Sequence, residues 1–130
     1  MTPTPAILGL TICDHVIIEE GTKKCSLVGS FSRISVSSFP GNVQPFSVFA
    51  LLTDGLGDGT IRLGVLRLET DQEVRNFTAP IHFPDKLTEL RVHFRVRELV
   101  VPGPGHYQFT LTIDGEFIAQ RVVGANYREV

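Results

Sequence analysis

The sequence predicts an all-β protein, a single-domain antiparallel β-sandwich of the immunoglobulin-like or C2-like type with about eight strands. Apolar runs of strand length recur between turn signals roughly every 8–12 residues, a spacing typical of sandwiches and barrels. No window sustains a helical period of about 3.6 residues. The pattern continues without a linker or an internal repeat over 130 residues, which predicts one domain covering residues 1–130.

The clearest element is the closing hairpin in the last third of the chain. Residues 106–113 alternate polar and apolar side chains, as a strand with one buried face does. Asp114 and Gly115 tolerate positive φ, which a two-residue hairpin turn requires, and a return strand follows them. Tyr107 occupies the position of the tyrosine corner of immunoglobulin-like sandwiches, although Gly103 stands where the common motif has Asp.

The other strands are predicted from apolar runs between breakers rich in Gly, Pro, Asp and Ser. Residues 73–77 form the weakest of these strands. Residues 86–90 have room for one helical turn, because Leu87 and Leu90 are three positions apart. The expected strands before the closing hairpin cover residues 6–19, 25–31, 33–36, 45–53, 60–69, 73–77 and 89–97.

The relative position of the two cysteines depends on the register of the first hairpin. If residues 20–23 form its turn, Ile18 lies opposite Cys25 and Cys13 lies near Ser30. The two thiols then have opposite strand parity and point to different faces. We therefore expect two reduced thiols rather than a disulfide, as is usual in a cytoplasmic protein.

The strand at 89–97 carries a basic stripe on its outer face. Its inward side chains are Val92, Phe94 and Val96, and its outward side chains are Arg91, His93, Arg95 and Arg97. Such a stripe is a candidate face for an anion or an acidic partner. No aromatic residue interleaves on it to stack bases, and the net charge of the chain is −2, so nucleic acid is not an expected partner. Cross-strand pairing with glutamates is the ordinary alternative.

Two segments, residues 16–18 and 46–52, are apolar on both faces. A two-layer sandwich hides only one face of each sheet, so the second face needs a cover, either the loop at 32–44 or another copy of the chain. At roughly 25 cal/mol per Å², leaving two or three such side chains in water costs several kcal/mol. We therefore expect self-association. The predicted interface residues are Ile17, Phe49 and Leu51.

The remaining polar motifs do not complete a catalytic or metal site. Residues 54–59 lack the alternating oxygen ligands and the terminal glutamate of an EF-hand loop, so an inter-strand turn is the favoured interpretation. The histidines and cysteines are not in metal-ligand spacing, and no serine lies in a nucleophile elbow. We expect no enzymatic activity, no catalytic or metal-binding residues and no cofactor.

Several short motifs, mostly turns and strand starts, occur in order along the chain. They are Cys13-Asp-His-Val16, Glu20-Gly-Thr22, Ser26-Leu-Val-Gly-Ser-Phe31, Ser38-Phe-Pro40, Phe83-Pro-Asp85, Pro104-Gly-His-Tyr-Gln-Phe109 and Asp114-Gly-Glu116. In these motifs the chain resembles an uncharacterised family of small bacterial all-β proteins, a domain of unknown function. The resemblance runs from about residue 6 to residue 123. It implies the sandwich fold and a bacterial cytoplasmic origin, and it lends no activity, cofactor or site residue.

The expected function is that of a non-enzymatic interaction or assembly module, which forms a homo-oligomer or binds a protein partner through apolar strand faces or edges. The alternative is a ligand-binding sandwich, in which the basic stripe holds an anion or loop aspartates hold a cation. Those aspartates are Asp14, Asp54, Asp58 and Asp114. A third interpretation, a hydrolase or nuclease accessory, requires a carboxylate within reach of a histidine. The apolar runs are far shorter than the roughly 20 residues that cross a bilayer, so we expect a cytoplasmic location and no membrane partner.

Overall fold

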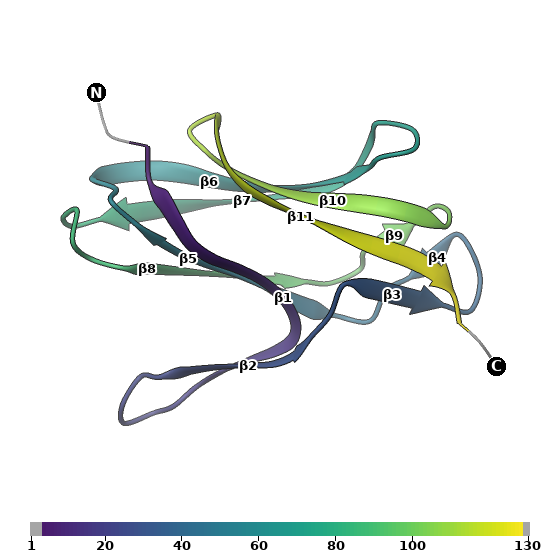
Figure 1. Cartoon of the computed structure of the whole chain (residues 1–130), viewed down its shortest axis with the longest axis horizontal. Coiled ribbons are helices and arrows are strands. Elements are labelled where there is room, and N and C mark those ends of the chain that lie inside the picture. The colour runs from purple at the N-terminus through teal and green to yellow at the C-terminus, as the bar shows by residue number, and fades with distance from the viewer. Residues whose placement is uncertain (1–3, 129–130) are drawn as a thin grey trace.

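The computed structural model describes residues 4–128, and within them it contains eleven strands and no helix. Two twisted sheets pack face to face (Figure 1), which confirms the predicted β-sandwich. One sheet has the order β2-β1-β5-β8, the other has the order β3-β11-β10-β6-β7, and β4 pairs with β9 in a small ribbon. The strands are β1 (Ala6–Ile18), β2 (Cys25–Ser30), β3 (Arg33–Val36), β4 (Gly41–Asn42), β5 (Phe46–Thr53), β6 (Gly57–Arg67), β7 (Gln72–Phe83), β8 (Leu90–Val96), β9 (Val100–Val101), β10 (Gly105–Ile113) and β11 (Glu116–Tyr127).

The core lies between the inner faces of the two sheets. Alternate residues of β10 are fully buried there, and so are the matching residues of β5 and β6 on either side of the core. Phe46 of β5 meets Phe109 of β10 edge to face across the layers, with ring centroids 5.9 Å apart. The largest fully buried side chains are Tyr107, Phe46, Phe109, Ile12, Leu52, Ile61, Leu63, Leu99 and Leu111.

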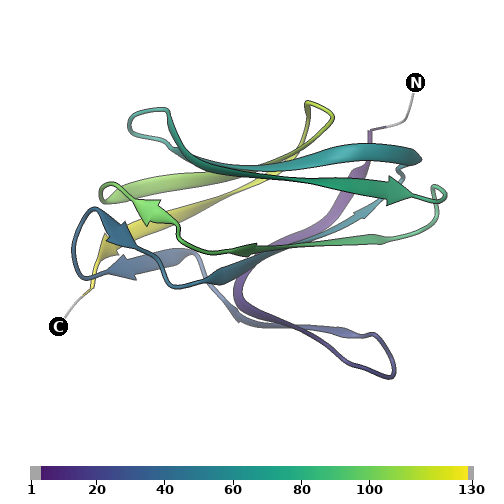
Figure 2. The same ribbon diagram turned by 180° about the vertical axis from the view of Figure 1, so that it is seen from behind.

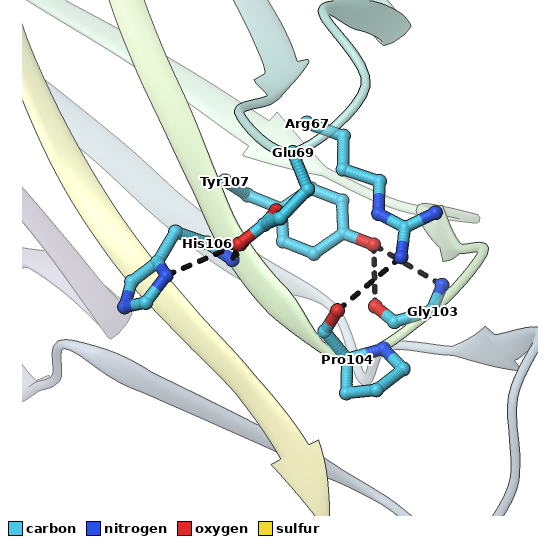
Figure 3. Close-up of polar contacts among 6 residues, drawn as sticks. All are labelled: Arg67, Glu69, Gly103, Pro104, His106 and Tyr107. Atoms are coloured by element: carbon cyan, nitrogen blue, oxygen red, sulfur yellow. Dashed lines mark hydrogen bonds and ion pairs between the residues drawn. The ribbon is translucent and has the colours of Figure 1, made fainter.

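The closing hairpin has the predicted geometry. Asp114 (φ 50°) and Gly115 (φ 82°) form its turn, and β10 pairs antiparallel with β11 along its whole length. The hydroxyl of Tyr107 donates to the carbonyl of Gly103 at 2.6 Å and accepts from the Gly103 amide at 3.3 Å (Figure 3). Both partners are backbone groups, so the tyrosine corner forms here without the usual Asp side chain.

The number of strands exceeds the prediction. Two of the extra strands, β4 and β9, have only two residues each, too few for an alternating pattern. The strand predicted weakly at 73–77 is in fact β7, a twelve-residue edge strand. A register shift between Val65 and Leu66 of β6 leaves Val74 without a direct partner, so the alternation in β7 changes phase there and hides the length of the strand.

Residues 86–90 form a turn rather than a helical turn. The Asp85 carboxylate accepts bonds from the amides of Leu87 and Thr88, both at 2.8 Å, and from the Thr88 hydroxyl at 2.9 Å. These bonds lower the pKa of Asp85, the largest cause being the hydroxyl of Thr88. The Asp85 carboxylate thus orders this segment as a turn, and β8 begins directly afterwards at Leu90.

The sandwich is not purely antiparallel. Strand β3 joins the five-stranded sheet by pairing parallel with β11, with Arg33 opposite Gly124 and Val36 opposite Tyr127. The segment expected to cover an apolar sheet face, residues 32–44, therefore supplies β3 and β4 instead. The cover for the apolar strand β5 has to come from elsewhere.

Candidate functional site

The most distinctive feature is a hairpin that leaves the sandwich. Strand β1 pairs with β5 as far as Cys13 and then continues, paired only with β2, from Cys13 to Ile18. We call residues 14–30 the hairpin arm. Figures 1 and 2 both show the arm projecting away from the packed sheets on the side of β5 and β8.

The base of the arm explains how β1 departs from its sheet. Gly29 adopts φ 73°, a conformation that other residues rarely adopt, opposite Asp14. A Cβ at this position would collide with the Asp14 carboxylate. The close approach and the positive φ both require glycine, and they mark the bend of the arm. The predicted register of the hairpin is confirmed, since Cys13 pairs with Ser30 and Ile18 pairs with Cys25.

The arm exposes apolar side chains on both of its faces. Ile17 is 53% exposed, and no residue from Asp14 to Ser30 is buried. Pairing places Val28 on the same face as Ile17, whereas Ile18 and Leu27 lie on the opposite face. The exposed large apolar residues of the arm are Ile17, Ile18, Leu27 and Val28.

Two arginines of β8 hold the arm above the sheet. The Arg95 guanidinium donates to the backbone carbonyl of Asp14 at 2.6 Å, and the Arg91 guanidinium donates to the carbonyl of Lys23 near the tip. Arg95 also donates to the hydroxyl of Ser47 at 3.0 Å. The His93 Nε2 lies 2.7 Å from the same hydroxyl. Three members of the basic stripe thus form a polar strap between β8, β5 and the arm.

Around the strap, burial disfavours the charged forms of the His93 imidazole and the Cys13 thiol. Burial, with Arg95 as the second cause, lowers the pKa of His93. Burial, with Asp14 as the second cause, raises the pKa of the Cys13 thiol, which is fully buried. A neutral imidazole and a neutral thiol are therefore favoured beneath the arm, and Cys13 is not an activated nucleophile.

The three predicted interface residues differ in their exposure to solvent. Ile17 is exposed and Leu51 is half-buried, but Phe49 is only 8% exposed. Phe49 lies in register between Thr11 of β1 and His93 of β8, because β5 is a central strand with neighbours on both sides. The expectation that Phe49 needs a further layer or a second copy as its cover is therefore wrong. The side chains beside it and the strap above it supply the cover within one chain.

The basic stripe is divided by the structure. Arg91, His93 and Arg95 share one face and bond within the chain, so their polar groups already have partners. Arg97 lies beyond the end of β8, where its carbonyl accepts a bond from Arg75. The sequence does not predict the strap, because its acceptors are carbonyls far away in the chain.

Two of the four aspartates proposed as cation ligands form hydrogen bonds within the chain, and Asp54 lies at a positive φ of 61° directly after β5. Asp58 lies 2.7 Å from Nδ1 of His82, and Asp114 accepts a bond from the amide of Thr60 at 2.9 Å. Asp14 lies on the arm instead. Within residues 4–128, no three His, Cys, Asp or Glu residues lie close enough together to hold a metal ion.

Two histidines do lie beside carboxylates, as the third interpretation requires. They are His82, which contacts Asp58, and His106, whose Nδ1 lies 3.2 Å from Glu69. Both pairs are exposed. Searching the described residues for a helix that is long and apolar enough to span a bilayer gives none.

Comparison with known proteins places the chain in a family. A model for a family of unknown function, DUF6941, matches residues 8–123, which is most of the chain. The protein belongs to the DUF6941 family. Among curated proteins, nothing matches this DUF6941 chain.

The likeness of this DUF6941 protein to two solved structures is low, with TM-scores below 0.5. One is the CARDB domain of the PF1109 protein from Pyrococcus furiosus, in complex with di-metal ions. Its TM-score is 0.44 at 14% identity, over 95% of this chain and 90% of that chain. Another is the alkylpurine DNA glycosylase AlkC of Pseudomonas fluorescens, bound to DNA containing an abasic site analog. Its TM-score is 0.43 at 9% identity, over 90% of this chain and 30% of that chain.

Proposed function

We propose that this DUF6941 protein is a non-enzymatic assembly module in which the hairpin arm binds the arm of a second copy. The single observation that carries the proposal is a two-stranded ribbon with apolar side chains exposed on both faces. An isolated two-stranded hairpin is marginally stable in water, and burial of a face against another surface is the usual remedy. The strap holds the arm in place but leaves Ile17 exposed.

The edge of the arm favours a second copy as the partner. Strand β2 is the end strand of its sheet, so one row of its backbone groups faces outward. Antiparallel pairing of β2 with β2 of another copy satisfies both rows at once and creates a closed, two-fold interface. It also brings Leu27 and Val28 of both copies into one sheet.

The charges of the arm are compatible with such pairing. Its tip carries Glu19 and Glu20 beside Lys23 and Lys24, so the tip has no net charge to repel another copy. Edge pairing leaves the faces of the ribbon open and brings Leu27 and Val28 of each copy beside the other copy's β2. These four side chains, at about 1 kcal/mol each, supply roughly 4 kcal/mol before the cost of association, in addition to the backbone hydrogen bonds. The expected affinity is therefore modest, in the micromolar range or weaker.

The test is the oligomeric state as a function of concentration. Sedimentation velocity between about 5 and 500 µM should show a monomer shifting to a dimer. Val28→Glu places a charge in the proposed interface on a side chain that is already exposed, so the variant should fold and stay monomeric across this range. Phe117→Glu is the matched control, because Phe117, like Val28, is an exposed apolar residue of a hairpin, but it lies at the tip of the β10–β11 hairpin.

The two variants separate the arm from general surface hydrophobicity. Dimerisation of wild type and Phe117→Glu, with loss only in Val28→Glu, supports the proposal. A wild-type monomer at the highest concentration rejects it, and so does a dimer that Val28→Glu leaves unchanged.

We further propose a bacterial, cytoplasmic setting for this module. Its two cysteines, Cys13 and Cys25, are both free thiols on different faces of the hairpin, which suits a reducing compartment. The basic stripe does not favour the ligand-binding alternative, since Arg91 and Arg95 already bind backbone carbonyls of the arm.

A further inference from the structure

A second feature lies on the outer face of the five-stranded sheet. Arg33 of β3 pairs with Gly124 of β11, and Gly124 pairs with His106 of β10. Paired residues point to the same face, and the neighbours of Gly124 in β11, Val123 and Ala125, point into the core. Arg33, Gly124 and His106 therefore form one outward-facing row across three strands.

The glycine makes this row a trough. Neighbouring strands are roughly 4.8 Å apart, so Arg33 and His106 stand about 10 Å apart at their backbones, with no side chain between them. A Cβ built on Gly124 has no atom within 4 Å, so the space above it is open. The resulting cleft of about 330 Å³ is also lined by Ser32, Val122 and Asn126.

The two sides of the trough offer hydrogen-bond donors. Within residues 4–128 the Arg33 side chain forms no hydrogen bond or ion pair, unlike Arg91 and Arg95 of the strap. Its guanidinium, with five donors, remains available to a ligand. The hydroxyl of Ser32 and the amide of Asn126 add neutral donors at the same cleft.

The His106 ring is held in place by Glu69. The Glu69 carboxylate accepts a bond from the His106 amide at 2.9 Å and lies 3.2 Å from Nδ1 of the ring. The bond from this amide is the first cause of the lowered pKa of Glu69, so the carboxylate is anionic near neutral pH. Figure 3 shows the second ring nitrogen of His106 turned away from Glu69. With Nδ1–H donated to Glu69, Nε2 is the nitrogen left for a ligand or a proton.

The geometry points to an oxyanion-binding site in this trough, which takes a carboxylate or phosphate group between Arg33 and His106 above Gly124. The guanidinium supplies the charge and a planar pair of donors, the Ser32 hydroxyl and the Asn126 amide supply neutral donors, His106 forms the opposite wall, and the glycine supplies the room. Glu69 does not itself line the cleft, and its carboxylate lies at the rim beside His106 and Gly105. The site lies within one copy and does not require a second one, and at Arg33 it adjoins the cleft that Asp14, Gly29 and Ser30 line at the base of the arm.

A ¹H–¹⁵N NMR titration tests the site, with inorganic phosphate and succinate as two separate probes up to about 10 mM. Binding should shift the amide resonances of Gly124, Arg33 and His106 in a saturable way. The stronger of the two probes identifies the class of ligand as phosphorylated or carboxylic. Arg33→Gln should weaken binding about tenfold, as loss of a charge-assisted bond does.

Matched variants distinguish the trough from general positive charge and from altered folding. Arg97→Gln removes the same charge from an exposed position outside the trough and should leave the affinity unchanged. Gly124→Val fills the trough without a clash and should abolish binding, whereas Gly9→Val, at another strand glycine with open space, should not. The inference is overturned if neither probe gives saturable shifts, if the shifts map to residues 91–97, or if Arg33→Gln and Gly124→Val bind as wild type does.

Discussion

Two hairpins of this protein share a motif but differ in what surrounds them. Strands β10 and β11 turn at Asp114 and Gly115, and the arm turns where Lys23 also adopts a positive φ of 61°. Alternate residues of β10 are fully buried in the core, whereas no residue of the arm is buried. Both ribbons are rich in apolar side chains, so local sequence alone does not set their different environments.

This difference shows that the elements packed against a hairpin, and not the hairpin itself, determine whether its apolar side chains are buried. The β10–β11 hairpin has β6 beside it and the four-stranded sheet across the core from it. Among the residues that the structure describes, the arm is held by the strap from Arg91 and Arg95, which bonds to backbone carbonyls and leaves the apolar side chains free. A ribbon held in this way is available for binding.

The largest expected effect comes from truncating equivalent leucines in the two hairpins. Leu111→Ala in β10 removes a fully buried side chain and should reduce the free energy of unfolding by about 2–5 kcal/mol. Leu27→Ala in the arm should reduce it by less than about 1 kcal/mol. Urea denaturation at low protein concentration, where copies do not associate, measures both. Equal losses would contradict the description of the arm as uncovered.

A smaller effect is expected from loosening the strap. Arg95→Met keeps the stem but removes the bonds to Asp14 and Ser47, which should reduce stability by about 1–2 kcal/mol. Hydrogen exchange should also accelerate at the Glu19 and Lys23 amides, which bond within the arm, while the β10–β11 amides are unaffected. Arg97→Met is the control. Unchanged exchange in the arm of Arg95→Met would show that the strap does not hold it.

The smallest expected effect is a dependence on pH under the arm. Because the pKa of His93 is lowered in the folded state, the unfolded chain takes up a proton more readily. The contribution of His93 to stability is therefore complete above its ordinary pKa of 6.5 and is lost as the pH falls toward the folded value. His93→Gln, which can still bond Ser47, should lose less stability than wild type between about pH 7.5 and pH 5 in thermal denaturation. Parallel pH profiles for the two proteins would refute this assignment.

The predictable part of the fold was set by short-range patterns. The register of the first hairpin, with Cys13 near Ser30, followed from the position of one turn. The tyrosine corner at Tyr107 followed from a local motif. In contrast, the length of β7 was obscured by a bulge that interrupts its alternation, and the parallel pairing of β3 with β11 joins segments about ninety positions apart, with no local signal.

The candidate sites divide in the same way. The apolar run at 16–18 identified half of the arm, because such a run is unusual on a two-faced strand. Phe49 was misinterpreted, because its neighbours in β1 and β8 come from distant segments and cover it within one chain. The row of Arg33, Gly124 and His106 depends on the long-range pairing of β3 with β11, which no local pattern signals. The pairing of His106 with Gly124 lies within the predicted hairpin, but a register shift between Leu111 and Thr112 changes which residues face each other.

The position of Cys13 opposite Ser30 has a consequence for how this architecture can vary. The two residues face each other where the arm leaves the sandwich. A two-residue turn that joins them directly would therefore remove the arm and keep the chain continuous. Neither β5 nor β8 would need to move, and only the arginine contacts would be lost. The arm is thus a removable appendage. Insertion or deletion can lengthen, shorten or replace it while the sandwich is preserved.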